Sequence, residues 1–215
     1  MPHLEELKQR VIDGETAAAT TLTEAALAAG SSPDAILTEA LYPAMGIVGQ
    51  RMQVHEYFLP DVLLAARAMQ ACAALLQPLL VKNHALKPIG TAVACTVAGD
   101  LHDIGKNLVS IMLQGAGFAV VDLGNNCPAE KVVEAVRQHE PDVVAMSAML
   151  TTTMLNMKGV IDALQAAGLR DRVHVMVGGA PLDATFAREI GADFYGDDAP
   201  TASAHARRRM GTATR

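Results

Sequence analysis

Tryptophan is absent from the sequence, and aromatic residues make up only 3% of its 215 residues. The interior must therefore be filled mainly by Ala, Leu, Val and Met, which favours small, closely packed helices. The three cysteines, Cys72, Cys95 and Cys127, are an odd number without CxxC spacing. This content argues against a disulfide framework and against a zinc site, and it fits a reducing cytoplasm.

Long charge-free apolar runs and an excess of positive charge are missing as well. No stretch reaches the roughly 18 residues of a membrane span, and the N-terminal segment has no apolar signal core. The formal net charge is −6, and the basic run Arg207–Arg209 is expected to be a solvated last helical turn. We therefore expect a soluble cytoplasmic protein with neither nucleic acid nor membrane among its partners.

The first part of the chain has the spacing of helices only. Hydrophobic residues make up 51% of the chain, enough for a packed core. From Leu4 to about Asn83 they recur at helical spacing, with breaks at Gly30–Pro33 and Tyr57–Pro60. Ser32 and Pro33 are typical of a helix start, and a long helix is expected over Asp61–Leu80. This pattern predicts a bundle of four or five helices.

The second part alternates strands with helices, after a polar linker over Lys82–Gly90. Each strand is apolar throughout, which indicates a parallel sheet covered on both faces. We expect strands at 91–97, 118–123, 142–147, 173–177 and 193–195, and helices at 104–115, 128–139, 153–166, 182–190 and 198–209. The prediction is an α/β protein: a helical domain over residues 1–88 and a five-stranded doubly wound domain over residues 89–215.

Polar residues follow the first and third predicted strands. In a doubly wound sheet of order 2-1-3-4-5, ligands bind beyond the carboxyl ends of these two strands. Asp100 and His102 are two residues apart, so the carboxylate can orient the imidazole as it does for many metal-bound histidines, and Ser147 could hydrogen-bond Asp100. The alternative is a helix-capping loop in which Asp103 is the N-cap and His102 a surface residue.

Two glycine patterns allow other readings. Gly178 and Gly179 follow the fourth strand, where they form either a tight turn or a place at which a flat ligand approaches the backbone. Gly99 and Gly105 lack the spacing of a phosphate-binding loop, and Asn107 replaces its hydroxyl residue. Nucleoside triphosphate binding is therefore not expected.

Together these motifs resemble those of cobalamin-binding domains in which a protein histidine ligates cobalt. The family pattern DxHxxG, SxL and GG corresponds to Asp100–Gly105, Ser147–Met149 and Gly178–Gly179. The intervening 41 residues (106–146) and 28 residues (150–177) resemble the family spacing, and Met149 replaces the usual Leu. In the helical part, Met45–Gly49 and Tyr57–Met69 resemble the cap of methyl-carrying corrinoid proteins, so that the resemblance covers nearly the whole chain.

The resemblance implies roles for individual residues. His102 would be the lower cobalt ligand, the metal-binding residue, with Asp100 and Ser147 behind it as a proton-linked relay. Phe58, Leu59 and Val62 would cover the upper face of the cofactor, or else belong to an ordinary bundle core. The remaining cofactor-binding residues would be Gly99, Asp103, Ile104, Gly105, Met149, Thr151, Gly178, Gly179 and Ala199.

The resemblance also implies a function in one-carbon metabolism. The chain would carry a methyl group on the cobalt of cobalamin, as methylcobalamin or a related cobamide, and would be a subunit of a methyltransferase system rather than a complete enzyme. Its partners would be a substrate-specific methyltransferase, a second methyltransferase that passes the methyl group to a folate, pterin or thiol, and a corrinoid reactivation protein. The alternatives are a cobalamin-dependent sensor, which usually carries a DNA-binding domain not seen here, and the small subunit of an adenosylcobalamin mutase. The methyl donor and acceptor, the cobamide's lower base and the oligomeric state do not follow from these residues.

Overall fold

The computed structural model describes residues 2–82 and 88–212. The chain divides into two compact units, residues 1–87 and residues 88–215. Most of the predicted linker, residues 83–87, lies outside the described residues. The domain bounds 1–88 and 89–215 stay a proposal.

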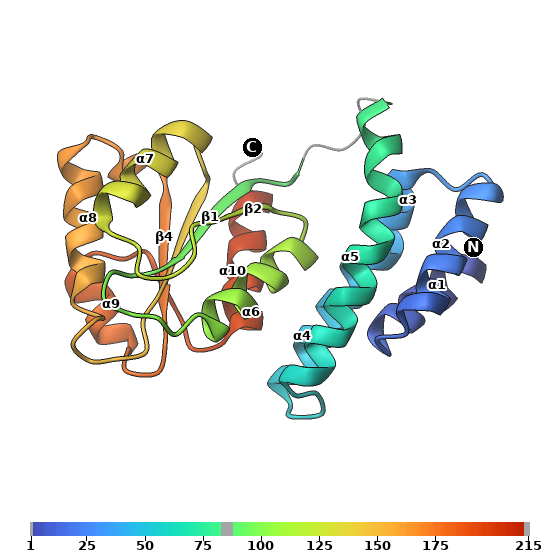
Figure 1. Cartoon of the computed structure of the whole chain (residues 1–215), viewed down its shortest axis with the longest axis horizontal. Helices are drawn as coiled ribbons and strands as arrows, with labels where there is room; N and C mark the ends of the chain where they lie inside the picture. The colour runs from blue at the N-terminus through green and yellow to red at the C-terminus, as the bar shows by residue number, and fades with distance from the viewer. Residues whose placement is uncertain (1, 83–87, 213–215) are drawn as a thin grey trace. The chain divides into compact units, whose positions relative to one another are not determined.

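The first unit consists of helices, as predicted (Figure 1). Ser32 begins the third helix as expected, because its hydroxyl oxygen accepts a hydrogen bond from the Ala35 N–H at 3.1 Å. The elements are α1 (Pro2–Ile12), α2 (Thr16–Ala28), α3 (Pro33–Ile36), a π-helical turn (Leu37–Leu41), α4 (Tyr42–Gln53) and α5 (Leu59–Lys82).

Helix α5 supplies the central core of this unit. Val62, Ala65, Met69, Cys72 and Leu76 are buried at helical spacing along one face. The burial of Val62 agrees with the alternative of an ordinary bundle core, and its role as a cover of the cofactor stays a prediction.

By length and composition alone, α5 could also cross a membrane over Leu59–Leu80. This segment contains Asp61 and Arg67, and a core helix of a bundle meets the same criteria. The absence of a membrane partner therefore stays a prediction.

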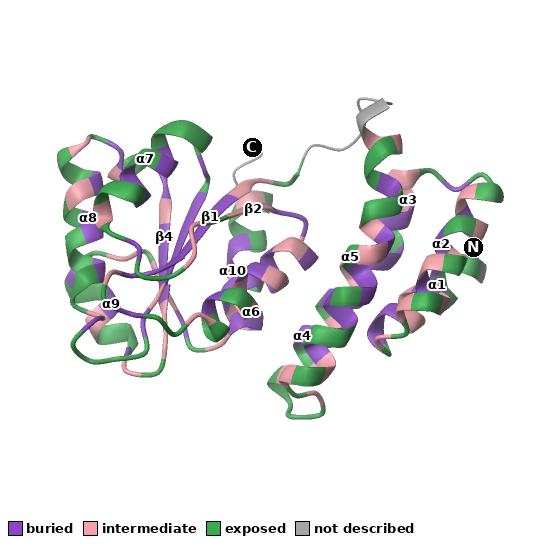
Figure 2. Ribbon diagram, viewed as in Figure 1, coloured by how far each residue is buried: buried purple, intermediate pink, exposed green. Residues whose placement is uncertain are grey.

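The second unit is a parallel five-stranded sheet with the predicted order β2-β1-β3-β4-β5. Helices α6 and α10 cover one face, and α7, α8 and α9 cover the other (Figure 1). The central strands β1, β3 and β4 are almost entirely buried, as their apolar sequences require (Figure 2). The strands are β1 (Thr91–Thr96), β2 (Ala119–Asp122), β3 (Val143–Ser147), β4 (His174–Gly178) and β5 (Phe194–Gly196). The helices are α6 (Ile104–Gly115), α7 (Ala129–His139), α8 (Asn156–Ala166), α9 (Ala184–Ile190) and α10 (Ala199–Thr212), with a 3-10 turn at Arg170–Arg172.

One boundary differs from the prediction in a way that concerns the site. Helix α8 begins at Asn156, whereas the apolar spacing predicted a helix from residue 153. Residues 151–155 form a turn instead, and the Thr153 hydroxyl within it donates a hydrogen bond to the distant Asp100 at 2.6 Å. This long-range contact holds Thr153 outside the helix.

Candidate functional site

The carboxyl ends of three strands lie side by side and define the site. In the sheet register, Thr96 of β1 is paired with Ser147 of β3, which is paired with Gly178 of β4. The chain then leaves β1 through the His102 loop (Ala98–Asp103), which has no regular secondary structure before α6 begins. Because parallel strands present their carboxyl ends at one edge, the predicted motifs meet there.

Asp100 and His102 form a direct pair within this loop. The His102 Nδ1 atom lies 2.8 Å from Asp100 Oδ1, and the His102 backbone N–H donates to the same oxygen at 3.0 Å. The carboxyl side chain is fully buried, whereas the imidazole is 58% exposed. The loop thus presents the ring to solvent while its base is anchored in the protein.

The second oxygen of Asp100 is also satisfied. Asp100 Oδ2 accepts the Met149 N–H at 2.7 Å and the Thr153 hydroxyl at 2.6 Å. Burial alone would raise the pKa of Asp100, but these donors together with those of His102 outweigh it, and the pKa lies well below its ordinary value. Asp100 is therefore an ionised acceptor, so a neutral His102 ring carries its proton on Nδ1 and leaves the Nε2 lone pair available.

Thr153 occupies the position that was expected for Ser147. The Ser147 hydroxyl makes no hydrogen bond to Asp100 in the described part of the chain and faces α6, where a Cβ added to Gly105 would lie 3.8 Å from Ser147 Oγ. The predicted bond between Ser147 and Asp100 is thus wrong in this structure. The run Thr151–Thr153, which begins two residues after Met149 of the SxL motif, was the available signal, but nothing in the sequence distinguishes its third hydroxyl from the others.

We expect Thr153→Val to destabilise the α/β unit by about 1–3 kcal/mol, because a nearly isosteric side chain would leave a buried carboxylate oxygen without one donor. Urea unfolding of the protein without cofactor would measure this change. Thr152→Val is the matched control, since Thr152 is exposed and makes no comparable contact. Equal stability of the two variants would contradict the role of Thr153.

Exposed apolar residues, called here the apolar rim, lie next to His102 in the chain and in the segment after β3. Residues beside His102 and after β3 are unusually exposed for their type, namely Leu101, Ile104, Met149, Leu150 and Leu155. Exposed apolar residues gathered at one edge mark a surface that a ligand or partner covers. Ile104 and Met149 were predicted as cofactor-binding residues on sequence grounds.

The other residues predicted within the α/β unit lie in the segments that follow the strand ends or begin the next helices. Gly99, Gly105 and Thr151 are exposed, and Asp103 has the N-cap position of α6, although its side chain forms no capping hydrogen bond. Ala199 is buried at the start of α10. Phe58 is exposed and Leu59 half-buried in the helical unit, and their role as a cover stays a prediction.

The Gly178–Gly179 pair is required by the protein's own backbone. A Cβ on Gly179, which has φ +133°, would lie 1.8 Å from the Ala148 carbonyl oxygen, and a Cβ on Gly178 would lie 2.7 Å from the Gly196 carbonyl oxygen. Both distances are far below van der Waals contact. The close approach predicted for a ligand is therefore already present between β4, β5 and the segment after β3.

These residues fit a metal that brings most of its ligands with it. The described residues contain no group of three or more His, Cys, Asp or Glu side chains that could hold a bare ion. His102 offers one nitrogen whose partner nitrogen is fixed by a buried carboxylate, as is typical of metal-bound histidines. A cobalt already held in a corrin ring would take this one nitrogen of His102, and the apolar rim would suit a large flat macrocycle.

The proteins that this chain resembles also point to a corrinoid cofactor. Two family models, each described as a B12 binding domain, match residues 90–204 and residues 3–77. Trimethylamine corrinoid protein 1 of Methanosarcina acetivorans is 40% identical over 193 residues, 89% of each chain. The dimethylamine corrinoid protein of Methanosarcina barkeri is 43% identical over 175 residues, 81% of this chain and 82% of the relative.

Solved structures give the same result. The methanol:cobalamin methyltransferase complex MtaBC of Methanosarcina barkeri matches with a TM-score of 0.87 at 32% identity, over 98% of this chain and 80% of that chain. The monomethylamine corrinoid protein of the same organism matches with a TM-score of 0.55 at 36% identity, over 97% of this chain and 98% of that chain. The chain therefore belongs to the B12-binding family, among the corrinoid proteins of methyltransferase systems, and cobalamin or a related corrinoid is its cofactor.

Proposed function

We propose that this protein carries a methyl group between a substrate-specific methyltransferase and a second methyltransferase, with His102 as the lower ligand of its corrinoid. The observation that carries the proposal is the exposed His102 imidazole, whose Nδ1 is fixed at 2.8 Å by a fully buried, ionised Asp100. When bound, the corrinoid supplies a cobalt centre that accepts and donates the methyl group.

The protein's residues supply ligation, orientation and shielding. Asp100 keeps the proton of His102 on Nδ1 and makes the Nε2 lone pair a stronger electron donor to a metal. The hydrogen bonds from Thr153 and Met149 keep Asp100 ionised. The apolar rim excludes water from the face of the corrinoid that lies against it. We propose that Gly99, Gly105, Ser147 and the remaining residues predicted at this edge line the cofactor's tail.

The substrate is proposed from the relatives. Those with 40–43% identity are trimethylamine and dimethylamine corrinoid proteins, whereas the match to the methanol complex is 32% identical. The higher sequence identity to the methylamine proteins favours a methylamine as the methyl source. The second methyltransferase, its folate, pterin or thiol acceptor, a reactivation protein and a cytoplasmic location complete the proposal, without nucleic acid or membrane.

The test is a partner assay with the reconstituted, reduced holoprotein. We expect one methylamine methyltransferase of the source organism to change the corrinoid absorbance in a substrate-dependent way, to an extent that matches the amount of protein. The methanol methyltransferase is the comparison, and heat-inactivated partner is the control. Failure of every methyltransferase to methylate a properly loaded protein would refute the carrier function. No observation favours the sensor or mutase alternatives.

A further inference from the structure

The His102 loop has no regular structure of its own, yet its backbone is held at nearly every residue. Asn156 Nδ2 donates to the Ala98 carbonyl at 2.8 Å, and the Thr96 hydroxyl donates to the His102 carbonyl at 3.2 Å. The Asp100 N–H donates to the Val97 carbonyl at 3.2 Å. Side chains and backbone outside the loop therefore fix where it presents the imidazole.

Asn126 makes the central pair of these bonds. Its side-chain Oδ1 accepts the Gly99 N–H at 2.8 Å, and its own N–H donates to the Asp100 carbonyl at 2.9 Å. These two bonds hold the peptide units on both sides of the Gly99–Asp100 linkage. Since Asp100 is the residue that orients His102, a shift of this linkage moves both the carboxylate and the ring.

The backbone of Asn126 suits this task. Its φ is +47°, in the left-handed region that Asn adopts more readily than most residues. In this conformation both the N–H and the side-chain oxygen of Asn126 face the His102 loop, as the two bonds show. Gly99 also has a positive φ, +79°, which a glycine adopts readily. This conformation lets the segment that contains Gly99 approach the segment that contains Asn126.

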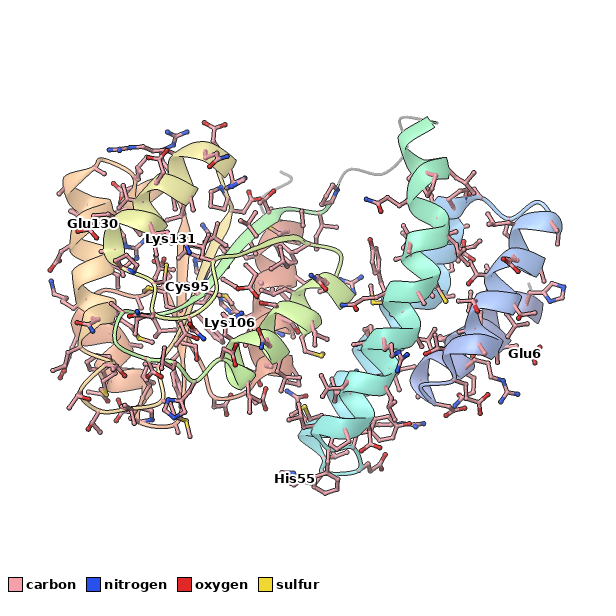
Figure 3. The ribbon with its side chains drawn as sticks, viewed as in Figure 1. Glu6, His55, Cys95, Lys106, Glu130 and Lys131 are labelled. Carbon is pink, nitrogen blue, oxygen red and sulfur yellow. The ribbon has the colours of Figure 1, made fainter. Side chains whose placement is uncertain are left out.

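The β2–α7 loop (Leu123–Pro128), which contains Asn126, is itself held from behind. Lys106 of α6 is 3% exposed and donates hydrogen bonds to Asn107 Oδ1, at 2.6 Å, and to the Asp122 carboxylate. The other Asp122 oxygen accepts the Gly124 N–H at 2.8 Å, and Lys131 of α7 donates to the Leu123 carbonyl at 2.7 Å. Figure 3 labels Lys106 and Lys131, which come from α6 and α7. The loop is therefore a firm support.

We propose that Asn126 is a positioning residue for the cobalt ligand: its side-chain oxygen holds the Gly99 N–H and so fixes the height and direction of the His102 imidazole. This inference rests on the proposed function, because it presupposes that His102 ligates a corrinoid. Asn126 touches neither the ring nor the site of the reaction and acts only through the loop. Loosening a metal ligand's support by such a step costs roughly 10–100-fold in affinity or activity.

The test compares three variants of the full chain reconstituted with hydroxocobalamin. Asn126→Gly keeps the positive φ but removes the acceptor, whereas Asn126→Asp keeps an acceptor oxygen at the same place. Asn125→Ala is the neighbouring control, because its bond to the Leu101 carbonyl, at 3.4 Å, is marginal. The measurements are the nitrogen splitting of the cobalt(II) electron paramagnetic resonance signal in protein with isotope-labelled histidine, the cobalt midpoint potential and the affinity for hydroxocobalamin.

We expect Asn126→Gly to lower the histidine-ligated fraction and the affinity about tenfold, while Asn126→Asp and Asn125→Ala stay close to wild type. Circular dichroism checks that every variant is folded. Wild-type behaviour of Asn126→Gly, or equal defects in Asn126→Gly and Asn126→Asp, would overturn the inference. A wild-type holoprotein without nitrogen splitting would instead refute His102 ligation, and with it the proposed function, so the two failures are distinguishable.

Discussion

His102→Ala is expected to abolish the histidine-ligated spectrum of the cobalamin-loaded protein. It should also weaken cofactor affinity by at least roughly 10–100-fold, which is the usual cost of losing a residue that only hydrogen-bonds a metal ligand. The reason is that His102 is the histidine that the His102 loop (Ala98–Asp103) presents at the strand ends. Absorbance and the nitrogen splitting of the cobalt(II) signal measure ligation, isotope-labelled histidine distinguishes His102 from the cofactor's own nitrogen base, and a titration with hydroxocobalamin measures affinity.

The variant should remain folded, which makes the result interpretable. The imidazole is 58% exposed, and Asp100 keeps the Thr153 hydroxyl and the Met149 N–H after the ring is removed. The free energy of unfolding should therefore change by only about 1 kcal/mol. Added imidazole should restore part of the nitrogen-ligated signal, because the vacated position is open to solvent.

His139→Ala is the matched control, since His139 is an exposed histidine in the last turn of α7, away from the site. It should retain the wild-type spectrum and affinity. An unchanged spectrum in His102→Ala would show that another group ligates cobalt or that the cofactor keeps its own base, and the ligand assignment would then be wrong.

The fold could be predicted well because its signals are local and periodic. The uniformly apolar segments at 91–97 and 142–147 predicted buried parallel strands, and the structure confirms both their pairing and the order of the sheet. The start of α8 was wrong because Thr153 is held by Asp100, 53 residues away in the chain. No window of local sequence contains both partners of such a contact.

The site was predictable only where one motif contained both partners. Asp100 and His102 are two residues apart, and the structure pairs them as expected. The donors to Asp100 Oδ2 and the support from Asn126 come from other loops, so their identity depends on how the strands bring those loops together. Ser147 was a reasonable candidate by motif, but its hydroxyl faces Gly105 instead.

Gly179→Ala is expected to be the most destabilising single-methyl change in the α/β unit. The left-handed backbone at φ +133° costs a residue with a Cβ about 1–2 kcal/mol, and overpacking against a rigid carbonyl adds about 1–3 kcal/mol. The Ala148 oxygen, 1.8 Å from the added Cβ, belongs to backbone that pairs with the end of β4, since the Ala148 N–H donates to the Gly178 carbonyl. It cannot move without breaking that pairing.

Two other glycines separate the causes of this loss. Gly168 has φ +69° and no atom within 4 Å of an added Cβ, so Gly168→Ala should cost only the backbone term of about 1–2 kcal/mol. Gly159 lies in α8 with open space around it, and Gly159→Ala should be neutral or stabilising by up to about 1 kcal/mol. Urea unfolding of the protein without cofactor should rank the three variants in this order. If Gly179→Ala were as stable as Gly168→Ala, the contact with Ala148 would not limit this position, and approach of a ligand would again be the better reason for the glycine pair.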